Sequence, residues 1–450
     1  MSKKKKIDLL ESGIKRVVIK MTIPMLISFF VMIIFNLTDT YFVSRLGEKP
    51  LAGMSFTFPI IMILVTIGVG LGAAASSVIS RSIGTGDIEK SKRLSSDILV
   101  FTILTGVTIS TIGVLTIKPV FSLLGAEPET IKLISQYMTT WYFGIPFIMI
   151  AMVGNAIIRA TGDTKLPAII MLMSAVTNLI FDPILIFGIS SFEGMGIKGA
   201  ATATVMARLV GSSTTIYFLV FKKKIITFTH PKVEEFLDSW KQLIYIALPA
   251  IGSNVLIPVS LAIITRILAD FGEDAVTAFG VGGKIDSLAM IPIMALSTAL
   301  SPIIGQNLGA KKFDRIDEAI KFTYKILIYW SLFITITIIL FSSNLSMIFN
   351  KTEAPIAMTS YYLMIIPISY MAVSYFSINN SILYSTNEPH PAALLVIIKM
   401  FILSLPLAYL GSYLYDAKGI FISVVISNIL ASFISHMIIN SKKRKLKGVS

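Results

Sequence analysis

The sequence predicts an all-α polytopic membrane protein with twelve transmembrane helices in two six-helix lobes. Three observations predict this fold. The chain has 450 residues, of which 54% are hydrophobic and only 14% are charged, and its mean hydropathy is +0.81. Apolar runs long enough to span a bilayer recur along the whole chain. The second half also repeats features of the first at a constant offset of 225 residues.

Twelve apolar runs reach the length of about 20 residues that a membrane helix needs. Those of the first half are 17–42, 52–80, 96–117, 133–158, 166–189 and 198–221, and those of the second half are 242–268, 277–304, 320–341, 356–383, 392–412 and 419–440. They predict a cytoplasmic tail at 1–16, an N-terminal lobe at 17–221, a cytoplasmic connector at 222–241, a C-terminal lobe at 242–440 and a basic cytoplasmic tail at 441–450.

The distribution of Lys and Arg predicts the orientation. With the N-terminus inside, 28 of the 39 basic residues fall in inside segments, 7 in outside segments and 4 within spans. Cytoplasmic loops carry such an excess of positive charge in membrane proteins. We therefore expect both termini in the cytoplasm and an integral protein of a prokaryotic-type plasma (inner) membrane.

The internal repeat is parallel. Pro24 aligns with Pro249, and Gly84 aligns with Gly309. The loop sequences agree, because SRSIGTGDIEKSKR matches GQNLGAKKFDRIDE at the same offset. Six helices per half is an even number, so both halves enter the membrane in the same direction. Secondary transporters often have this plan, with binding sites at or within the repeat interface.

Several function classes are excluded or weakened by composition. The chain has no cysteine, so no disulfide and no cysteine-based metal or redox site is available. The net charge of +14 sits in short loops and at the termini rather than in a basic domain, so we expect no nucleic-acid partner. Metalloprotease, serine-hydrolase and Walker A motifs are lacking, so we expect no enzyme, no cofactor and no resident metal.

Two carboxylates lie deep in apolar runs. Asp39 follows Asn36 by three residues, and Asp182 follows Asn178 by four, so each acid shares a helix face with an amide. A carboxylate at this depth costs roughly 2.5–3.5 kcal/mol on insertion scales, which makes a functional site the first hypothesis. The alternative is a hydrogen-bonded acid that only holds packed helices together.

The second half lacks equivalents of these acids, because Asp39 plus 225 is Ile264. This asymmetry suggests an ion or proton site in the N-terminal lobe, formed by Asp39 and Asp182 with their amide neighbours Asn36 and Asn178. Two neighbouring carboxylates in low dielectric do not both stay charged, which suits a proton carrier. Oxygen ligands from acids, amides and hydroxyls equally suit Na⁺, so the sequence leaves H⁺ and Na⁺ open.

Four further charged residues in or beside spans have no assigned role from sequence. Asp286 follows Lys284 closely, and either a local ion pair or a coupling role would explain it. Arg208 and Arg266 either snorkel toward water or pair with an acid.

Pro24 and Pro183 each remove a backbone donor inside a span and are expected to bend their helices.

The chain resembles the multidrug and toxic compound extrusion (MATE) family over nearly its whole length. The resemblance rests on IPMLISFFVMIIFNLTDTYFVSRLG in helix 1, RSIGTGD with its repeat GQNLGAKK, RATGDTKLP, NLIFDPILIFG and GIKGAATAT. It implies two lobes, alternating access and antiport of H⁺ or Na⁺ against bulky amphipathic compounds that are mostly cationic. We expect such substrates and membrane lipids as partners, and a monomer.

In the branch of the family with its cation site in the N-terminal lobe, the resemblance places that site on Asp39, Asn178, Asp182 and Thr204. These four would hold Na⁺ if it is the coupling ion. The resemblance also places Tyr137 and Asn155 in the cavity of that lobe. A flippase for a lipid-linked or other amphipathic precursor remains the main alternative, followed by a membrane-embedded enzyme.

Overall fold

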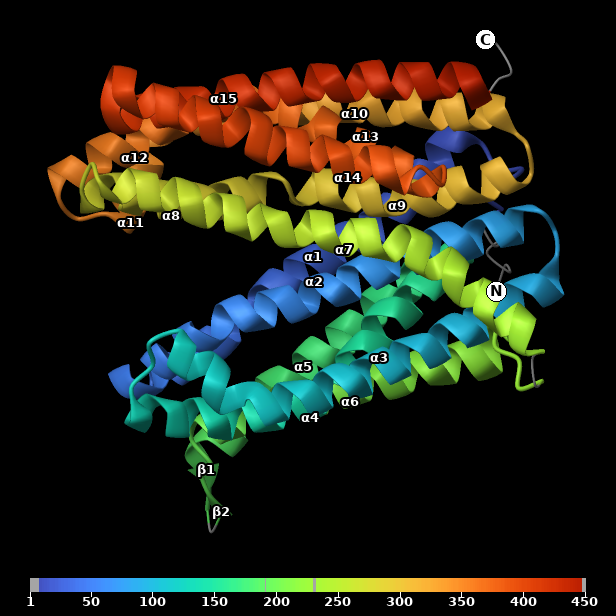
Figure 1. Ribbon diagram of the computed structural model, residues 1–450, viewed down its shortest axis with the longest axis horizontal. Helices are drawn as coiled ribbons and strands as arrows, with labels where there is room; N and C mark the ends of the chain where they lie inside the picture. Colours follow the sequence, from blue (N-terminus) through green and yellow to red (C-terminus); the bar gives the residue numbers. More distant parts are fainter. Residues whose placement is uncertain (1–7, 191, 230–231, 447–450) are drawn as a thin grey trace, which may run out of the picture. The chain divides into compact units, whose positions relative to one another are not determined.

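The computed structural model describes residues 8–190, 192–229 and 232–446, and for 48–52 and 443–446 it describes the backbone alone. The predicted tails 1–16 and 441–450 and the predicted connector 222–241 therefore lie partly outside the described residues. Within the described part the chain is helical except for its connecting segments and one two-residue pairing, β1 (Gly188–Ile189) with β2 (Phe192–Glu193), between α5 and α6 (Figure 1).

The helices follow the predicted runs and extend beyond them. The first half contains α1 (Ile14–Ser44), α2 (Glu48–Gly84), α3 (Ile88–Leu123), α4 (Pro128–Ala160), α5 (Lys165–Phe187), α6 (Ile197–Tyr217) and the π-helical turn η1 (Phe218–Lys222). The second half contains α7 (Val233–Ala269), α8 (Glu273–Ala289), α9 (Ile291–Gly309), α10 (Phe313–Leu340), α11 (Ser342–Phe349), α12 (Glu353–Ile365), the 3-10 turn η2 (Ile366–Ser369), α13 (Tyr370–Ser385), α14 (Pro389–Ile397), the π-helical segment η3 (Ile398–Ser404) and α15 (Leu405–Leu446).

Among the described residues, eleven helical segments are long and apolar enough to cross a membrane. The last of them, Pro389–Lys442, contains two predicted spans. They are separated at Tyr415 and Asp416, whose backbone is not helical. Dividing the segment there gives the predicted twelve, and the prediction of an all-α polytopic membrane fold is confirmed.

Some predicted spans are not single regular helices. The run 277–304 is divided at Met290, where Pro292 follows in the first turn of α9 and cannot donate a backbone hydrogen bond. Pro367 lies in η2, which divides the run 356–383. The run 392–412 contains η3. Two of these irregular segments adjoin half-buried charged groups that are described below, because η2 lies beside a tyrosine that bonds Asp286 and η3 contains Lys399.

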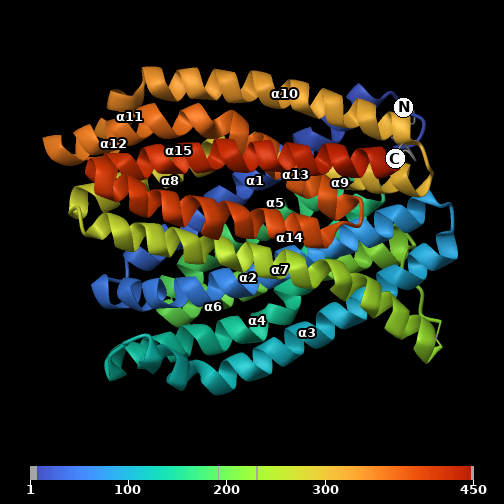
Figure 2. The same ribbon diagram turned by 45° about the horizontal axis from the view of Figure 1, so that its top comes forward.

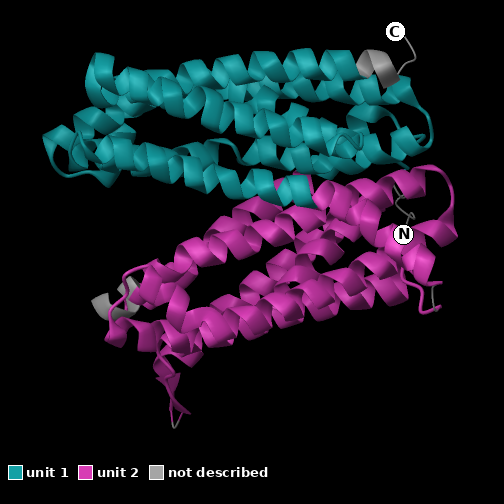
Figure 3. Cartoon of the chain, in the orientation of Figure 1, with its two compact units in different colours: residues 1–22, 248–450 teal, residues 23–247 magenta. Residues whose placement is uncertain are grey.

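The chain divides into two compact units, residues 23–247 and residues 1–22 with 248–450 (Figure 3). We call them the N-terminal unit and the C-terminal unit. Both boundaries fall inside a helix, α1 or α7. They differ from the predicted lobe ranges 17–221 and 242–440 because tertiary contacts, rather than the repeat, decide where the first turns of α1 and α7 pack.

In the N-terminal unit, α4 packs against α2, α3 and α6, and α5 packs against α6. The apolar window of α4 is 78% buried, more than that of any other candidate span in the described part of the chain. In the C-terminal unit, α13 packs against α9, α10 and α15, and α8 packs against α12 (Figure 2). The start of α1 completes this core, since Val17 and Met21 cluster with Leu300.

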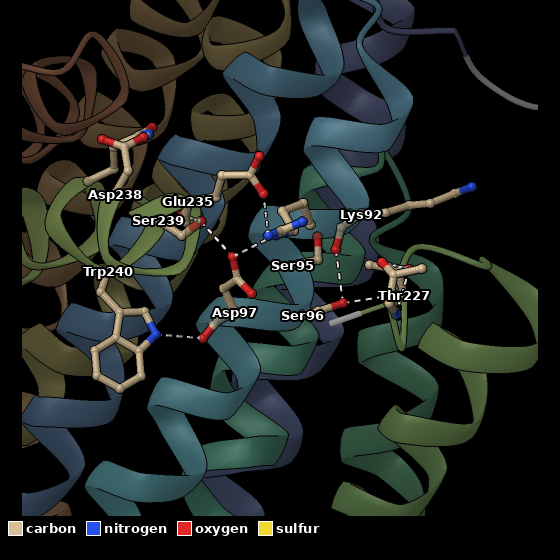
Figure 4. A network of polar contacts seen from close by, with 12 residues as sticks. Lys92, Ser95, Ser96, Asp97, Thr227, Glu235, Asp238, Ser239 and Trp240 are labelled. Carbon is tan, nitrogen blue, oxygen red and sulfur yellow. Dashed lines mark hydrogen bonds and ion pairs between the residues drawn. The ribbon is translucent and has the colours of Figure 1, made fainter. Parts of the chain in front are cut away.

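The start of α7 is tied to α3 by a polar network within the N-terminal unit (Figure 4). Ser239 Oγ donates to Asp97 Oδ2 at 2.6 Å, and Trp240 Nε1 donates to the Asp97 carbonyl at 3.1 Å. Arg93 pairs with Glu235 at 2.6 Å and lies 3.4 Å from the Asp97 carboxylate. Asp97 is only 4% exposed, so these partners compensate a buried charge.

We expect Ser239→Ala to lower the free energy of unfolding by about 1.5–3 kcal/mol, because the buried Asp97 carboxylate loses a charge-assisted hydrogen bond. Thermal unfolding in detergent, followed by fluorescence, measures the change. Asp238→Ala is the matched control, since Asp238 bonds Gln242 at an exposed position instead. Equal unfolding temperatures for the two variants would show that the network does not stabilise the unit.

A second contact ties the connector to the unit. Lys223 Nζ lies 2.5 Å from Oδ2 of Asp163, and Asp163 belongs to the loop between α4 and α5. Burial raises the pKa of the Asp163 carboxyl, but the hydrogen bond and charge of Lys223, together with hydrogen bonds from the backbone of Lys165 and Leu166, outweigh burial and hold that pKa below its ordinary value. The ion pair is therefore present at neutral pH and is lost only in acid, as the pH falls through the lowered pKa.

Candidate functional site

Three helices of the N-terminal unit supply the four residues expected to hold the coupling ion. Asp39 comes from α1, Asn178 and Asp182 come from α5, and Thr204 comes from α6. All four are buried, with exposed fractions of 8%, 1%, 0% and 7% respectively. The two carboxylates are within electrostatic range of one another, since the charge of Asp39 acts on Asp182.

The cluster contains more acceptor oxygens than donors. Asn178 Nδ2 donates to Asp182 Oδ1 at 3.0 Å. Asp39 Oδ1, Asn178 Oδ1 and Asp182 Oδ2 are buried and have no hydrogen-bond partner among the described residues. Each buried oxygen without a partner costs about 1–3 kcal/mol. A proton or a hard cation would satisfy these oxygens, so the donor set fits either coupling ion.

Two more side chains act on this cluster. Tyr137 of α4 is 2% exposed and is influenced by the charges of both Asp39 and Asp182. Arg208 of α6 acts electrostatically on Asp39, and its guanidinium carbon lies 4.9 Å from the ring centroid of Phe35. Its Nε has no hydrogen-bond partner in the described part of the chain. The structure thus places Arg208, which the sequence left without a role, beside the candidate ion site.

Two other predicted residues, Asn36 and Asn155, make no hydrogen bond to the carboxylates among the described residues. Asn36 is exposed, although it precedes the buried Asp39 by less than one turn. Asn155 receives a hydrogen bond of 3.5 Å from Thr215 Oγ1, and no contact with either acid is recorded for it among the described residues. The ion-site role of Asn36 and the cavity role of Asn155 stay predictions.

Both predicted bending prolines lie inside continuous helices. Pro24 lies within α1, and its carbonyl accepts a hydrogen bond of 3.0 Å from Ser28 Oγ. Pro183 follows Asp182 directly within α5. Neither proline ends its helix, but each removes one amide donor from the helical ladder and so weakens it locally.

The C-terminal unit has a half-buried carboxylate, Asp286, whose role the sequence left open between a local ion pair and coupling. Asp286 of α8 does not pair with Lys284, which is exposed. Its carboxylate instead accepts hydrogen bonds from Tyr362 at 2.7 Å and from Tyr370 at 2.6 Å, on either side of η2. Gly282 permits this approach, since an added β-carbon there would lie 2.1 Å from the Tyr362 ring.

The tyrosines were a missed signal, because a tyrosine inside an apolar span needs a hydrogen-bond partner. Arg266, by contrast, pairs with Asp270 at 2.5 Å on the surface, where the two side chains are 73% and 63% exposed. That arrangement is one of the two that the sequence left open for Arg266.

Comparison of the sequence and the structure with known proteins identifies the family of this chain. The MatE family model matches residues 24–184 and again 249–410. The two matches begin 225 residues apart, at Pro24 and Pro249, which confirms the internal repeat.

Relatives of known name and structure agree with this match. The chain is 36% identical to an FAD transporter of Shewanella oneidensis, over 94% of this chain and 93% of that protein. It is 24% identical to the multidrug export protein MepA of Staphylococcus saprophyticus, over 95% and 94%. The structure of the Vibrio cholerae MATE transporter VcmN in the bent form matches with a TM-score of 0.92 and 29% identity, covering 97% of this chain and 98% of that one.

These proteins are transporters and not enzymes, and the matched segments include both the repeat and the helices that carry the buried acids. The chain is therefore an integral membrane protein that belongs to the multidrug and toxic compound extrusion family of transporters.

Proposed function

We propose that the protein exports amphipathic small molecules in exchange for H⁺ or Na⁺, as in the branch of the family whose cation site lies in the N-terminal lobe. The observation that carries the proposal is the buried cluster of Asp39, Asn178 and Asp182 with three unpartnered oxygens. The coupling ion is the cargo of this cluster, and no other cofactor is required. We also propose a monomer in the plasma membrane with both termini cytoplasmic.

The cluster couples the ion to conformation through charge. With no ion bound, Asp39 and Asp182 repel each other, and this repulsion favours a conformer in which they are separated or hydrated. Ion binding removes the repulsion and favours the closely packed conformer. Coupling requires this difference in ion affinity between the two conformers, because an ion that binds both equally shifts nothing.

We propose that α1 and α5 bend on ion binding at their prolines, where the backbone hydrogen-bond ladder is weakened. Pro24 and Pro183 each leave one carbonyl without its usual amide partner, so bending there breaks fewer hydrogen bonds than elsewhere. Asp182 directly precedes Pro183, so a change at its carboxylate acts on the weakest turn of α5. Tyr137 and Asn155 are the cavity residues of this proposal, and Thr204 is the fourth oxygen ligand.

Two substrate classes are supported by the relatives. Amphipathic, mostly cationic drugs fit the relatives named multidrug export proteins. A flavin dinucleotide fits the relative named FAD transporter, which is 36% identical over most of both chains. The flippase alternative is a third cargo class, distinguished by the same assay.

Transport into proteoliposomes under separate gradients tests the proposal. We expect a pH gradient or a Na⁺ gradient, applied alone, to drive concentrative movement of ethidium or of FAD, and the two gradients to differ in effect. Dissipating the gradient with an ionophore should abolish accumulation. Equal movement with and without a gradient would contradict ion coupling, and gradient-independent scrambling of a fluorescent lipid would favour the flippase.

A further inference from the structure

Lys399 is an intramembrane cation in the C-terminal unit. It lies in η3, about ten residues after α14 begins at Pro389. At 1.5 Å per residue this is ~15 Å along the helix, close to the middle of a hydrocarbon core ~30 Å thick. A charged side chain at such a depth normally pairs with another group or marks a binding site.

No acid compensates Lys399 within the described residues. No ion pair is recorded for it, and no acidic group acts on it electrostatically. The other three cations within the predicted apolar runs differ: Arg208 is near Asp39, Arg266 pairs with Asp270, and Lys284 is exposed. Lys399 is half-buried, and among the residues that the structure describes no acid neutralises its charge.

The ammonium has an aromatic neighbour instead. Lys399 Nζ lies 4.8 Å from the ring centroid of Phe376 on α13, and Phe376 is 7% exposed. A cation over a ring face gains some stabilisation, but the ring carries no net charge and leaves the ammonium uncompensated. The side chain is therefore turned toward the interior of the unit rather than extended toward water.

The backbone around Lys399 is fixed in an unusual form. The wider π-helical turns of η3 leave carbonyl groups displaced from the regular ladder. Ser427 of α15 donates to the Lys399 carbonyl at 3.4 Å and shares a hydrogen bond of 2.6 Å with Ser404. Both serines are buried. π-helical turns are rare and are frequently found at functional sites, so this backbone form is consistent with a binding role for Lys399.

A polar group on the neighbouring helix lacks a partner as well. Asn380 lies one turn after Phe376 on α13, and its Oδ1 is buried without a hydrogen-bond partner among the described residues. The adjacent Asn379 is different, because it accepts from Tyr324 and donates to Ser435 at 2.8 Å. Asn379 thus has structural contacts, while Asn380 keeps hydrogen-bonding capacity for something else.

We infer that Lys399, Phe376 and Asn380 form a binding site for the phosphate or carboxylate group of an aromatic small molecule. The ammonium supplies the positive charge, the Phe376 ring packs against the aromatic part, and the Asn380 amide hydrogen-bonds to polar substituents. The ligand supplies the negative charge that the protein lacks here. The inference rests on the proposed function in one respect, which is that the bound ligand is a transported substrate. Binding itself is measured in an assay that involves no transport.

Isothermal titration of the full-length protein in phosphatidylcholine nanodiscs tests this site. The probes are 1-naphthyl phosphate, 1-naphthylmethylammonium and inorganic phosphate. We expect 1-naphthyl phosphate to bind and Lys399→Gln to weaken it about tenfold or more, with 1-naphthylmethylammonium unaffected. Lys399→Arg should retain most of the affinity because it keeps the charge. Lys284→Gln, which removes an exposed cation, is the matched control and should bind normally.

Several results would overturn the inference. One is that the wild type and Lys399→Gln bind 1-naphthyl phosphate equally well. Another is that Lys284→Gln loses as much affinity for 1-naphthyl phosphate as Lys399→Gln does. A third is that the wild type binds inorganic phosphate and 1-naphthyl phosphate with the same affinity. Phosphatidylglycerol binding that depends on Lys399, without any naphthyl phosphate binding, would assign the site to a lipid headgroup and also overturn it.

Two further variants allow the site to be tested even if one substitution prevents folding. If Lys399→Gln does not fold, Lys399→Arg and Phe376→Leu test the same site, and Phe376→Leu should weaken naphthyl phosphate but not inorganic phosphate. Anion binding is measured in nanodiscs without a gradient, whereas ion coupling is measured as gradient-driven transport in proteoliposomes. Failure of ion coupling and failure of the anion site are therefore distinguishable.

Discussion

Asp39→Asn is expected to abolish ion-driven export while the protein still folds and inserts. The substitution keeps the size of the side chain but removes the charge that distinguishes ion-bound from ion-free states. Coupling energies of 1–3 kcal/mol correspond to factors of ~5–150, so gradient-driven transport should fall by about 100-fold, to the level of empty liposomes. Proteoliposome transport under the gradient identified for the wild type measures this loss.

Asp182→Asn should have the same effect, and the double variant should lose no more than either single one. Residues that act as one unit show such non-additivity. Asp286→Asn is the matched control, because it removes a membrane carboxylate held by Tyr362 and Tyr370 in the other unit. Ion-driven transport by Asp39→Asn at the wild-type rate would refute the proposed coupling site.

Gly419→Val is expected to prevent stable folding of the C-terminal helical hairpin. A β-carbon at Gly419 would lie 2.0 Å from the carbonyl oxygen of Gly411, and one at Gly411 would lie 2.4 Å from that of Gly419. Both clashes are with backbone, so the two legs of the hairpin must separate. Overpacking of this kind costs about 1–3 kcal/mol or more, and the chain reverses nearby at Tyr415 and Asp416.

The unfolding temperature and the monodisperse yield in detergent measure this effect. Gly280→Ala is the control, because nothing lies within 4 Å of a β-carbon added there, in the interior of α8. It should leave stability unchanged or raise it by up to about 1 kcal/mol through better helix propensity. A Gly419→Val protein as stable as Gly280→Ala would show that the close approach is dispensable.

Much of the fold follows from local properties of the sequence. Hydrophobic runs, positive loops and the 225-residue repeat require no tertiary information, and they predict an all-α membrane fold correctly. The helix breaks in the second half were less visible. Pro292 and Pro367 are breaking signals that can be read from sequence, and Pro406 follows η3 by two residues. The sequence does not show the contact that η3 makes with α15, where Ser427 donates to the Lys399 carbonyl.

The candidate ion site was also predicted only in part from the sequence. Sequence spacing places Asn178 and Asp182 on one face of α5, and the structure joins them by a hydrogen bond. The same reasoning placed Asn36 with Asp39, yet one is exposed and the other buried. Residues three apart on a helix point about 60° away from each other, so the edge of a buried face passes between them.

By itself, the sequence determined the membrane topology expected for this protein, its repeat and the presence of acids and bases at membrane depth. Only the tertiary structure decided which of these charges have partners: Asp286 with two tyrosines, Asp97 with the start of α7, and Lys399 with no acid in the described part of the chain. The physical reason is that helical periodicity fixes where a side chain points relative to its own helix, whereas neighbouring helices decide what it meets.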